Sequence, residues 1–117
     1  INGMVYDRGV RADYDGWRQL GNEGWSYDDV LPYFKKLEDF QPGGEEGFHG
    51  RGGPVLVTRP GIEHPLAKAF RDAAIAAGVP YNDDPSGSQR EGVVPADVTA
   101  SAGRRWRRPG TGARVDR

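Results

Sequence analysis

The density of glycine and proline constrains this chain most, because 18 Gly and 9 Pro together make 27 of its 117 residues. Glycine raises the entropic cost of ordering the backbone, and proline interrupts helices and sheet ladders, so long regular elements are excluded over much of the sequence. Hydrophobic residues are only 36% of the chain. We therefore expect an α+β arrangement of three to four short helices and one or two short strands joined by long loops. Such a set cannot cover its own sheet edges and helix faces, so it reads as part of a larger domain.

Composition also excludes several classes of protein. The chain contains no Cys, which rules out a disulfide scaffold and every thiol-based metal or redox site. No apolar run approaches the roughly 20 residues that a membrane-spanning helix needs. The charge is divided unevenly: residues 103–117 hold six Arg and one Asp, a net of +5, so the other 102 residues carry −6 of the overall −1. An acidic body with a basic tail leaves open a nucleic-acid arm, a tail that binds an acidic partner, or an artefact.

Two helices are predicted in the first 40 residues. Apolar positions three apart favour a helix over 11–21, with Gly21 as its stop. Ser26 is a good N-cap for the next segment, whose apolar stripe continues to Phe40. Because Pro32 has no backbone N–H, we expect a turn over 27–31 and a new helix that begins at Pro32.

The rest of the chain is predicted to alternate between loops and short elements. Residues 41–53 hold six Gly and one Pro and should form a loop, after which 54–58 is the best strand candidate. Pro65 suits the first position of a helix that Gly78 would end. Residues 82–87 read as a turn, and 92–99 as a strand weakened by its central proline.

Generic catalytic constellations are absent from the sequence. His49 and His64 stand 15 apart with no metal-ligand spacing, so the simplest interpretation is a loop histidine and a helix-capping one. The adjacent acidic pairs 28–29 and 83–84 suit a helix N-terminus and a turn better than acid–base chemistry. Aromatic residues interleave with acidic rather than basic ones, which argues against a nucleic-acid platform.

Four separated blocks nevertheless resemble the glucose–methanol–choline (GMC) oxidoreductase family, in particular its choline dehydrogenase-like members. In order, they are Ile1–Gly9 with Ala12–Trp17 and Gly24–Lys36, then Phe48–Val55, then Asn82–Pro85 with Gln89–Gly92, and finally Gly103–Arg105. The resemblance is nearly continuous from residue 1 to about residue 106. It implies that residues 1–106 are an internal segment of a larger α/β FAD-binding fold, and that residues 107–117 are an irregular Arg-rich tail, read as out of frame or truncated.

The resemblance further implies FAD-dependent oxidation of an alcohol, with choline or another primary alcohol as the small-molecule substrate. The matching stretch in the family runs along the flavin, so the cofactor contacts carry over to Asn2, Gly3, Met4 and Val5. Physically, Gly3 lets backbone approach a flat ring, and Asn2 offers both a donor and an acceptor. No catalytic or metal-binding residue is assigned, because the family's nucleotide-binding unit and catalytic histidine would lie before and after this chain. We therefore expect the isolated chain to be inactive.

An alternative function remains at this stage. It is a non-enzymatic binding module or inactive remnant whose basic tail binds nucleic acid or an acidic partner, although nucleic acid is the less favoured of these partners. The cellular location is also open: we expect the cytoplasm, or association with a membrane through the parent enzyme. Trp17 and Tyr27 could face a cationic substrate, but their helical spacing favours packing.

Overall fold

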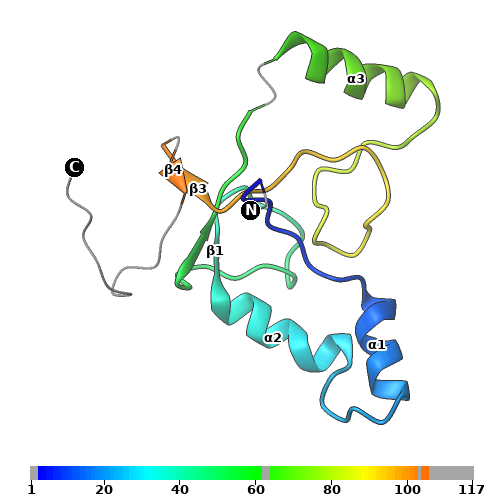
Figure 1. Cartoon of the computed structure of the whole chain (residues 1–117), viewed down its shortest axis with the longest axis vertical. Helices are drawn as coiled ribbons and strands as arrows, with labels where there is room; N and C mark the ends of the chain where they lie inside the picture. Colours follow the sequence, from blue (N-terminus) through cyan, green and yellow to red (C-terminus); the bar gives the residue numbers. More distant parts are fainter. Residues whose placement is uncertain (1–2, 62–63, 103, 106–117) are drawn as a thin grey trace.

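A computed structural model describes residues 3–61, 64–102 and 104–105 of the chain. Figure 1 shows the helices arranged around short strands, with most of the remaining chain in loops. The elements in chain order are α1 (Arg11–Gln19), α2 (Tyr27–Leu37), β1 (Glu38–Phe40), β2 (Val55–Val57), α3 (Pro65–Ala76), β3 (Ala100–Ser101) and β4 (Arg104–Arg105). The expected α+β class is confirmed, although the strands are more numerous and shorter than predicted.

The sheet structure is assembled from segments far apart in the sequence. Strands β1 and β2 pair in parallel, with Glu38 opposite Val55 and Phe40 opposite Val57. Just beyond β2, the backbone of Thr58 exchanges two hydrogen bonds with Val98, at 2.9 and 2.8 Å. Val98 in turn bridges Val5 in antiparallel orientation. The predicted strand over 92–99 is therefore reduced to isolated bridges, because its pairing is interrupted around the proline at position 95.

One helix prediction is wrong. The sequence predicted a break before Pro32, but α2 runs unbroken from Tyr27 to Leu37 with Pro32 inside it. The helix start is strongly capped, since the Ser26 side chain accepts from the Asp29 N–H and the Asp29 carboxylate accepts from the Ser26 N–H. Pro32 costs the hydrogen bond to the carbonyl of Asp28, an exposed residue that water can reach, so the helix tolerates the loss.

Other helix boundaries lie at the glycine and proline residues that the sequence predicted as helix stops and starts. Gly21 and Gly78 both take the left-handed conformation, with φ of 96° and 92°, just after α1 and α3. Pro65 is the first residue of α3 and the His64 side chain caps it, as the sequence indicated for a capping histidine. The apolar stripe that seemed to carry α2 to Phe40 instead crosses into β1, because the helix ends at Leu37.

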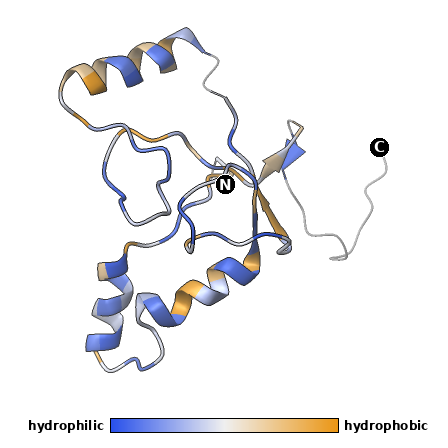
Figure 2. Cartoon of the chain, turned by 180° about the vertical axis from the view of Figure 1, so that it is seen from behind, coloured by the Kyte–Doolittle hydropathy of each residue, from blue (hydrophilic) through white to orange (hydrophobic). Residues whose placement is uncertain are grey.

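The buried core is small and polar. Among the described residues, the buried apolar side chains are Tyr27, Phe40 and Val57, while the buried polar ones are Arg8, Glu38, Asp84, Ser86 and Asp97. Helix α3 buries none of its residues, and Figure 2 shows apolar positions along its exposed surface. None of the three described helices is long and apolar enough to cross a membrane. Charged and polar contacts, more than apolar packing, therefore hold the loops together.

Candidate functional site

The residues predicted to contact a cofactor lie on an extended segment beside Val98. Of the four, Asn2 lies outside the described residues, whereas Gly3, Met4 and Val5 are described. Met4 has φ of 63°, a left-handed conformation that is unusual for a residue with a side chain. Val5 is 54% exposed. The segment therefore presents accessible backbone and an aliphatic side chain next to the strained residue Met4.

Backbone hydrogen bonds fix this segment against residues 97–99. The Tyr6 N–H donates to the Asp97 carbonyl at 2.8 Å, and the Thr99 N–H donates to the Met4 carbonyl at 2.8 Å. The Thr99 hydroxyl reaches the same carbonyl at 3.3 Å. Asp97 is itself buried and accepts two bonds from the Arg59 guanidinium, at 2.6 and 3.0 Å. The strained turn at Met4 is thus bonded on both sides.

Alternate side chains of the same segment converge on one buried carboxylate. The Tyr6 hydroxyl donates to Glu38 Oε2 at 2.8 Å, and Arg8 Nη2 donates to Glu38 Oε1 at 2.6 Å. Residues 6 and 8 point to the same side because side chains alternate along extended backbone. Arg8 also donates to the Phe48 carbonyl at 2.8 Å, which ties the segment to the glycine-rich loop over 41–53.

The ionisation of Glu38 is set by these donors. Its side chain is fully buried, and burial alone raises the pKa of the carboxyl group. The His49 ring, the Arg8 guanidinium, the Gly50 N–H and the Tyr6 hydroxyl together outweigh burial and lower the pKa to about 2 from a usual 4.5. Conversely, burial followed by the bond to the Glu38 carboxylate raises the pKa of Tyr6 to about 12. The segment therefore rests on a carboxylate that stays charged at neutral pH.

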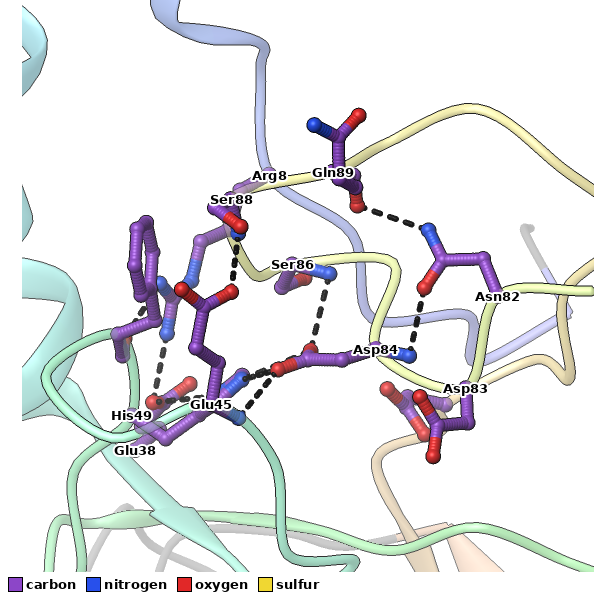
Figure 3. Close-up of polar contacts among 12 residues, drawn as sticks. Arg8, Glu38, Glu45, His49, Asn82, Asp83, Asp84, Ser86, Ser88 and Gln89 are labelled. Carbon is purple, nitrogen blue, oxygen red and sulfur yellow. Dashed lines mark hydrogen bonds and ion pairs between the residues drawn. The ribbon is translucent and has the colours of Figure 1, made fainter.

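A second carboxylate joins the network through His49. Its Nε2 lies 2.9 and 3.0 Å from the two oxygens of Asp84, and its Nδ1 lies 3.3 Å from Glu38 Oε1 (Figure 3). The ring stacks on Phe40, with centroids 3.7 Å apart. Asp84 also accepts from the Glu45 N–H at 2.7 Å. Three irregular segments, 3–10, 41–53 and 82–92, thus meet at one line of charges.

Sequence reasoning missed most of this network. The pair 83–84 was interpreted as turn residues and His49 as an ordinary loop residue, and Glu38 was not singled out. Asp84 does shape a turn, since it accepts from the Ser86 N–H at 3.3 Å, but it is only 8% exposed. A usable signal was the crowding of glycine around one histidine: a Cβ on Gly44 would stand 2.8 Å from the His49 ring and 2.7 Å from Asp84.

The aromatic residues of α1 and α2 follow the packing interpretation only in part. Tyr27 is buried, and the Arg11 guanidinium covers its ring at 4.5 Å. Trp17 contacts Trp25 edge-on, with centroids 5.7 Å apart, but stays 47% exposed. Together with Tyr14 and neighbouring residues of α2, the two tryptophans line an apolar groove on the surface. The basic tail over 107–117 lies outside the described residues.

Comparison with known proteins shows which family the chain belongs to. The family profile described as "GMC oxidoreductase" matches residues 1–110. The chain belongs to the GMC oxidoreductase family. Similar curated proteins include the oxygen-dependent choline dehydrogenases of Brucella ovis and Rhizobium etli, each 49% identical to this chain over 106 residues. This alignment covers 91% of the chain but 19% of each relative, so the chain spans about a fifth of their length.

Solved GMC structures share the fold of the described residues. Pyridoxine 4-oxidase from Mesorbium loti is 36% identical with a TM-score of 0.80, and the match covers 89% of this chain and 21% of that protein. An FAD-dependent oxidoreductase from Chaetomium thermophilum is also 36% identical, with a TM-score of 0.78 over 87% of this chain and 19% of that protein. The loops and short helices seen here therefore match a segment of a larger GMC enzyme.

Proposed function

We propose that this chain is the flavin-side segment of an FAD-dependent oxidoreductase that acts on the CH–OH group of an alcohol, either choline or another primary alcohol. The support comes from relatives named choline dehydrogenase at 49% identity and a solved relative described as FAD-dependent at 36%. Within the chain, one observation carries the proposal: Gly3 and Val5 are exposed on either side of the left-handed Met4, and the next residue, Tyr6, is bonded to the buried carboxylate of Glu38.

The described residues of this stretch fit a flat, largely apolar ring. A Cβ built on Gly3 would meet nothing nearer than Val5 Cγ2 at 3.8 Å, so the backbone there is open to a planar ligand. The exposed Val5 side chain offers aliphatic surface beside it. Left-handed backbone at a non-glycine residue such as Met4 costs about 1–3 kcal/mol and is typical of ligand-contacting segments. Asn2 remains the fourth proposed contact.

Bound FAD would supply the acceptor for the hydride that leaves the alcohol carbon. The role proposed for this chain is to hold and orient the ring through residues 2–5, with the Glu38 anchor keeping their backbone in place. None of the described residues is proposed as the base, and so the 117-residue chain by itself is proposed to be inactive. The half-exposed aromatic groove of Trp17 and Trp25 is proposed as cover on the substrate side. The proposed location is the cytoplasm.

The test is a segment exchange into a complete relative. The 106-residue aligned stretch of the Brucella ovis choline dehydrogenase is replaced by the matching stretch of this chain, and FAD content and choline oxidation are measured. We expect the exchange to retain FAD, and Val5→Asp to weaken FAD binding about tenfold or more, because it sets a charge against the apolar ring. The matched control is Val79→Asp, since Val79 is 41% exposed but lies after α3.

Equal FAD content in the Val5→Asp and Val79→Asp exchange proteins would overturn the proposed cofactor contact. Loss of choline oxidation with FAD retained would leave the flavin role standing and direct attention to another primary alcohol. A series of such alcohols, offered to the same exchange protein, then identifies the substrate class.

A further inference from the structure

The His49 ring lies between two carboxylates from different parts of the chain. Nε2 is 2.9 Å from Asp84 Oδ1, and Nδ1 is 3.3 Å from Glu38 Oε1. The side chains are nearly closed to solvent, with exposed fractions of 9% for His49, 11% for Asp84 and 0% for Glu38 (Figure 3). The histidine is thus the connection between β1 and the 82–92 segment.

Hydrogen-bond chemistry determines which protons this ring can carry. Carboxylate oxygens accept and do not donate, so Nε2 must donate to Asp84. The Asp84 carboxyl group also accepts from the N–H groups of Glu45 at 2.7 Å and Ser86 at 3.3 Å, so its oxygens face hydrogen-bond donors. Nδ1 is buried and makes no hydrogen bond, but it lies 3.3 Å from the Glu38 carboxylate, so an unprotonated nitrogen there would be repelled by the negative oxygen. A proton on each nitrogen turns both contacts into attractions.

Charge balance leads to the same assignment. With His49 positive, the line Arg8–Glu38–His49–Asp84 alternates in sign and sums to zero, whereas a neutral ring leaves a net −1 in a buried cluster. Uncompensated buried charge is strongly destabilising. The other titratable or charged groups that act on this cluster are Tyr6 on Glu38, Glu45 from the loop of His49, and Arg59 near Asp84.

We propose that His49 is a positioning residue that is protonated on both ring nitrogens and locks the 82–92 segment to the Glu38 anchor of residues 6 and 8. Loss of one proton then loosens the connection between the two carboxylates and shifts the backbone over 3–8. The effect on a flavin rests on the proposed function, whereas the protonation state and the connection between segments do not.

The protonation state is tested by ¹⁵N NMR of histidine-labelled protein, using the 117-residue chain and the segment-exchange protein in parallel. We expect both ring nitrogens of His49 to give shifts of protonated nitrogen near neutral pH, and Asp84→Asn to convert one of them to the unprotonated type. His64 serves as the internal control, since it caps an exposed helix end through Nδ1. A neutral ring at His49 in the folded protein, with the same shifts in Asp84→Asn, would overturn the proposal.

The positioning role is tested by pairing two variants in the exchange protein. His49→Gln leaves the buried cluster with a net −1, and Asp84→Asn removes the carboxylate that accepts from Nε2 of the ring. The double variant replaces this ion pair by two neutral amides and leaves Arg8 and Glu38 balanced. We therefore expect each single change to weaken FAD binding about fivefold or more, and the double change to weaken it less than the sum of the two. The visible circular dichroism of the flavin should move in the single variants and not in His64→Gln. Additive losses, or an unmoved flavin signal, would contradict the positioning role.

These readouts separate the two proposals. If Val5→Asp leaves FAD binding unchanged while the NMR shifts show a doubly protonated His49, the proposed cofactor contact fails and the His49 assignment stands. The reverse pattern, a neutral His49 with FAD binding sensitive to Val5→Asp, removes the His49 proposal alone.

Discussion

Replacing Glu38 by Gln tests whether one buried charge holds the site together. The substitution keeps the shape of the side chain but removes the anion that Arg8 and Tyr6 contact. The pKa of Glu38 falls from 4.5 to about 2 in the folded chain, and at about 1.4 kcal/mol per unit the donors favour the charged form by roughly 3 kcal/mol. Breaking a buried ion pair from one side costs about 3–5 kcal/mol. We expect Glu38→Gln to destabilise the chain by about 3 kcal/mol.

The assay is urea unfolding of the 117-residue chain, followed by tryptophan fluorescence with far-ultraviolet circular dichroism as a second probe. The matched control is Asp28→Asn, which also converts an acid to its amide but breaks the exposed pair with Arg11, where the side chains are 51% and 74% exposed. Exposed pairs contribute little, so the control should unfold almost as the parent does. If Glu38→Gln costs no more than Asp28→Asn, the carboxylate is not the anchor and the reasoning fails.

The same residue predicts how stability changes in acid. Because the folded pKa lies below the unfolded value, the unfolded state binds the proton first, and the contribution of Glu38 is complete above about pH 4.5. It is lost as the pH falls toward about 2. The Glu38→Gln variant should lack this part of the acid dependence, and overlapping stability curves of parent and variant between those pH values would contradict the assignment.

Three further predictions concern the surroundings of Glu38 and the unexpected helix. Tyr6→Phe should lower the free energy of unfolding by about 1.5–3 kcal/mol. The parent should lose the contribution of the Tyr6 hydroxyl as the pH rises from about 10 to the Tyr6 pKa of about 12, and the variant should lack this alkaline dependence. Urea unfolding across alkaline pH measures both. Gly44→Ala should destabilise by about 1–3 kcal/mol, because its Cβ would crowd the histidine and Asp84, whereas Gly16→Ala, in open space on α1, should stabilise by about 0.5–1 kcal/mol in the same assay. Pro32→Ala restores a helix donor and should stabilise α2 by about 1–3 kcal/mol, and a raised helical signal on thermal melting checks it.

The local elements were largely readable from short-range signals. Gly21 and Gly78 ended helices, Pro65 began one, and His64 capped it, because each effect depends on the backbone within a few residues. The error at Pro32 has the same origin. A proline removes one hydrogen-bond donor wherever it stands. Whether the helix continues through it depends on how well the N-terminus of the helix is capped and on whether water reaches the carbonyl that loses its partner.

Patterns along the sequence are enough to predict the class of this protein: short helices bounded by glycine and proline, loops where glycine is dense, and ordered blocks that resemble GMC oxidoreductases. The buried line of charges that joins Glu38, His49 and Asp84 to Arg8 could not be predicted in this way, because it forms only when the chain folds. Neighbours along this line are separated by 30, 11 and 35 positions in the sequence, with no common spacing. Hydrogen bonds and ion pairs act over a few ångströms of space rather than along the chain, so their partners are fixed only when the loops between them have folded.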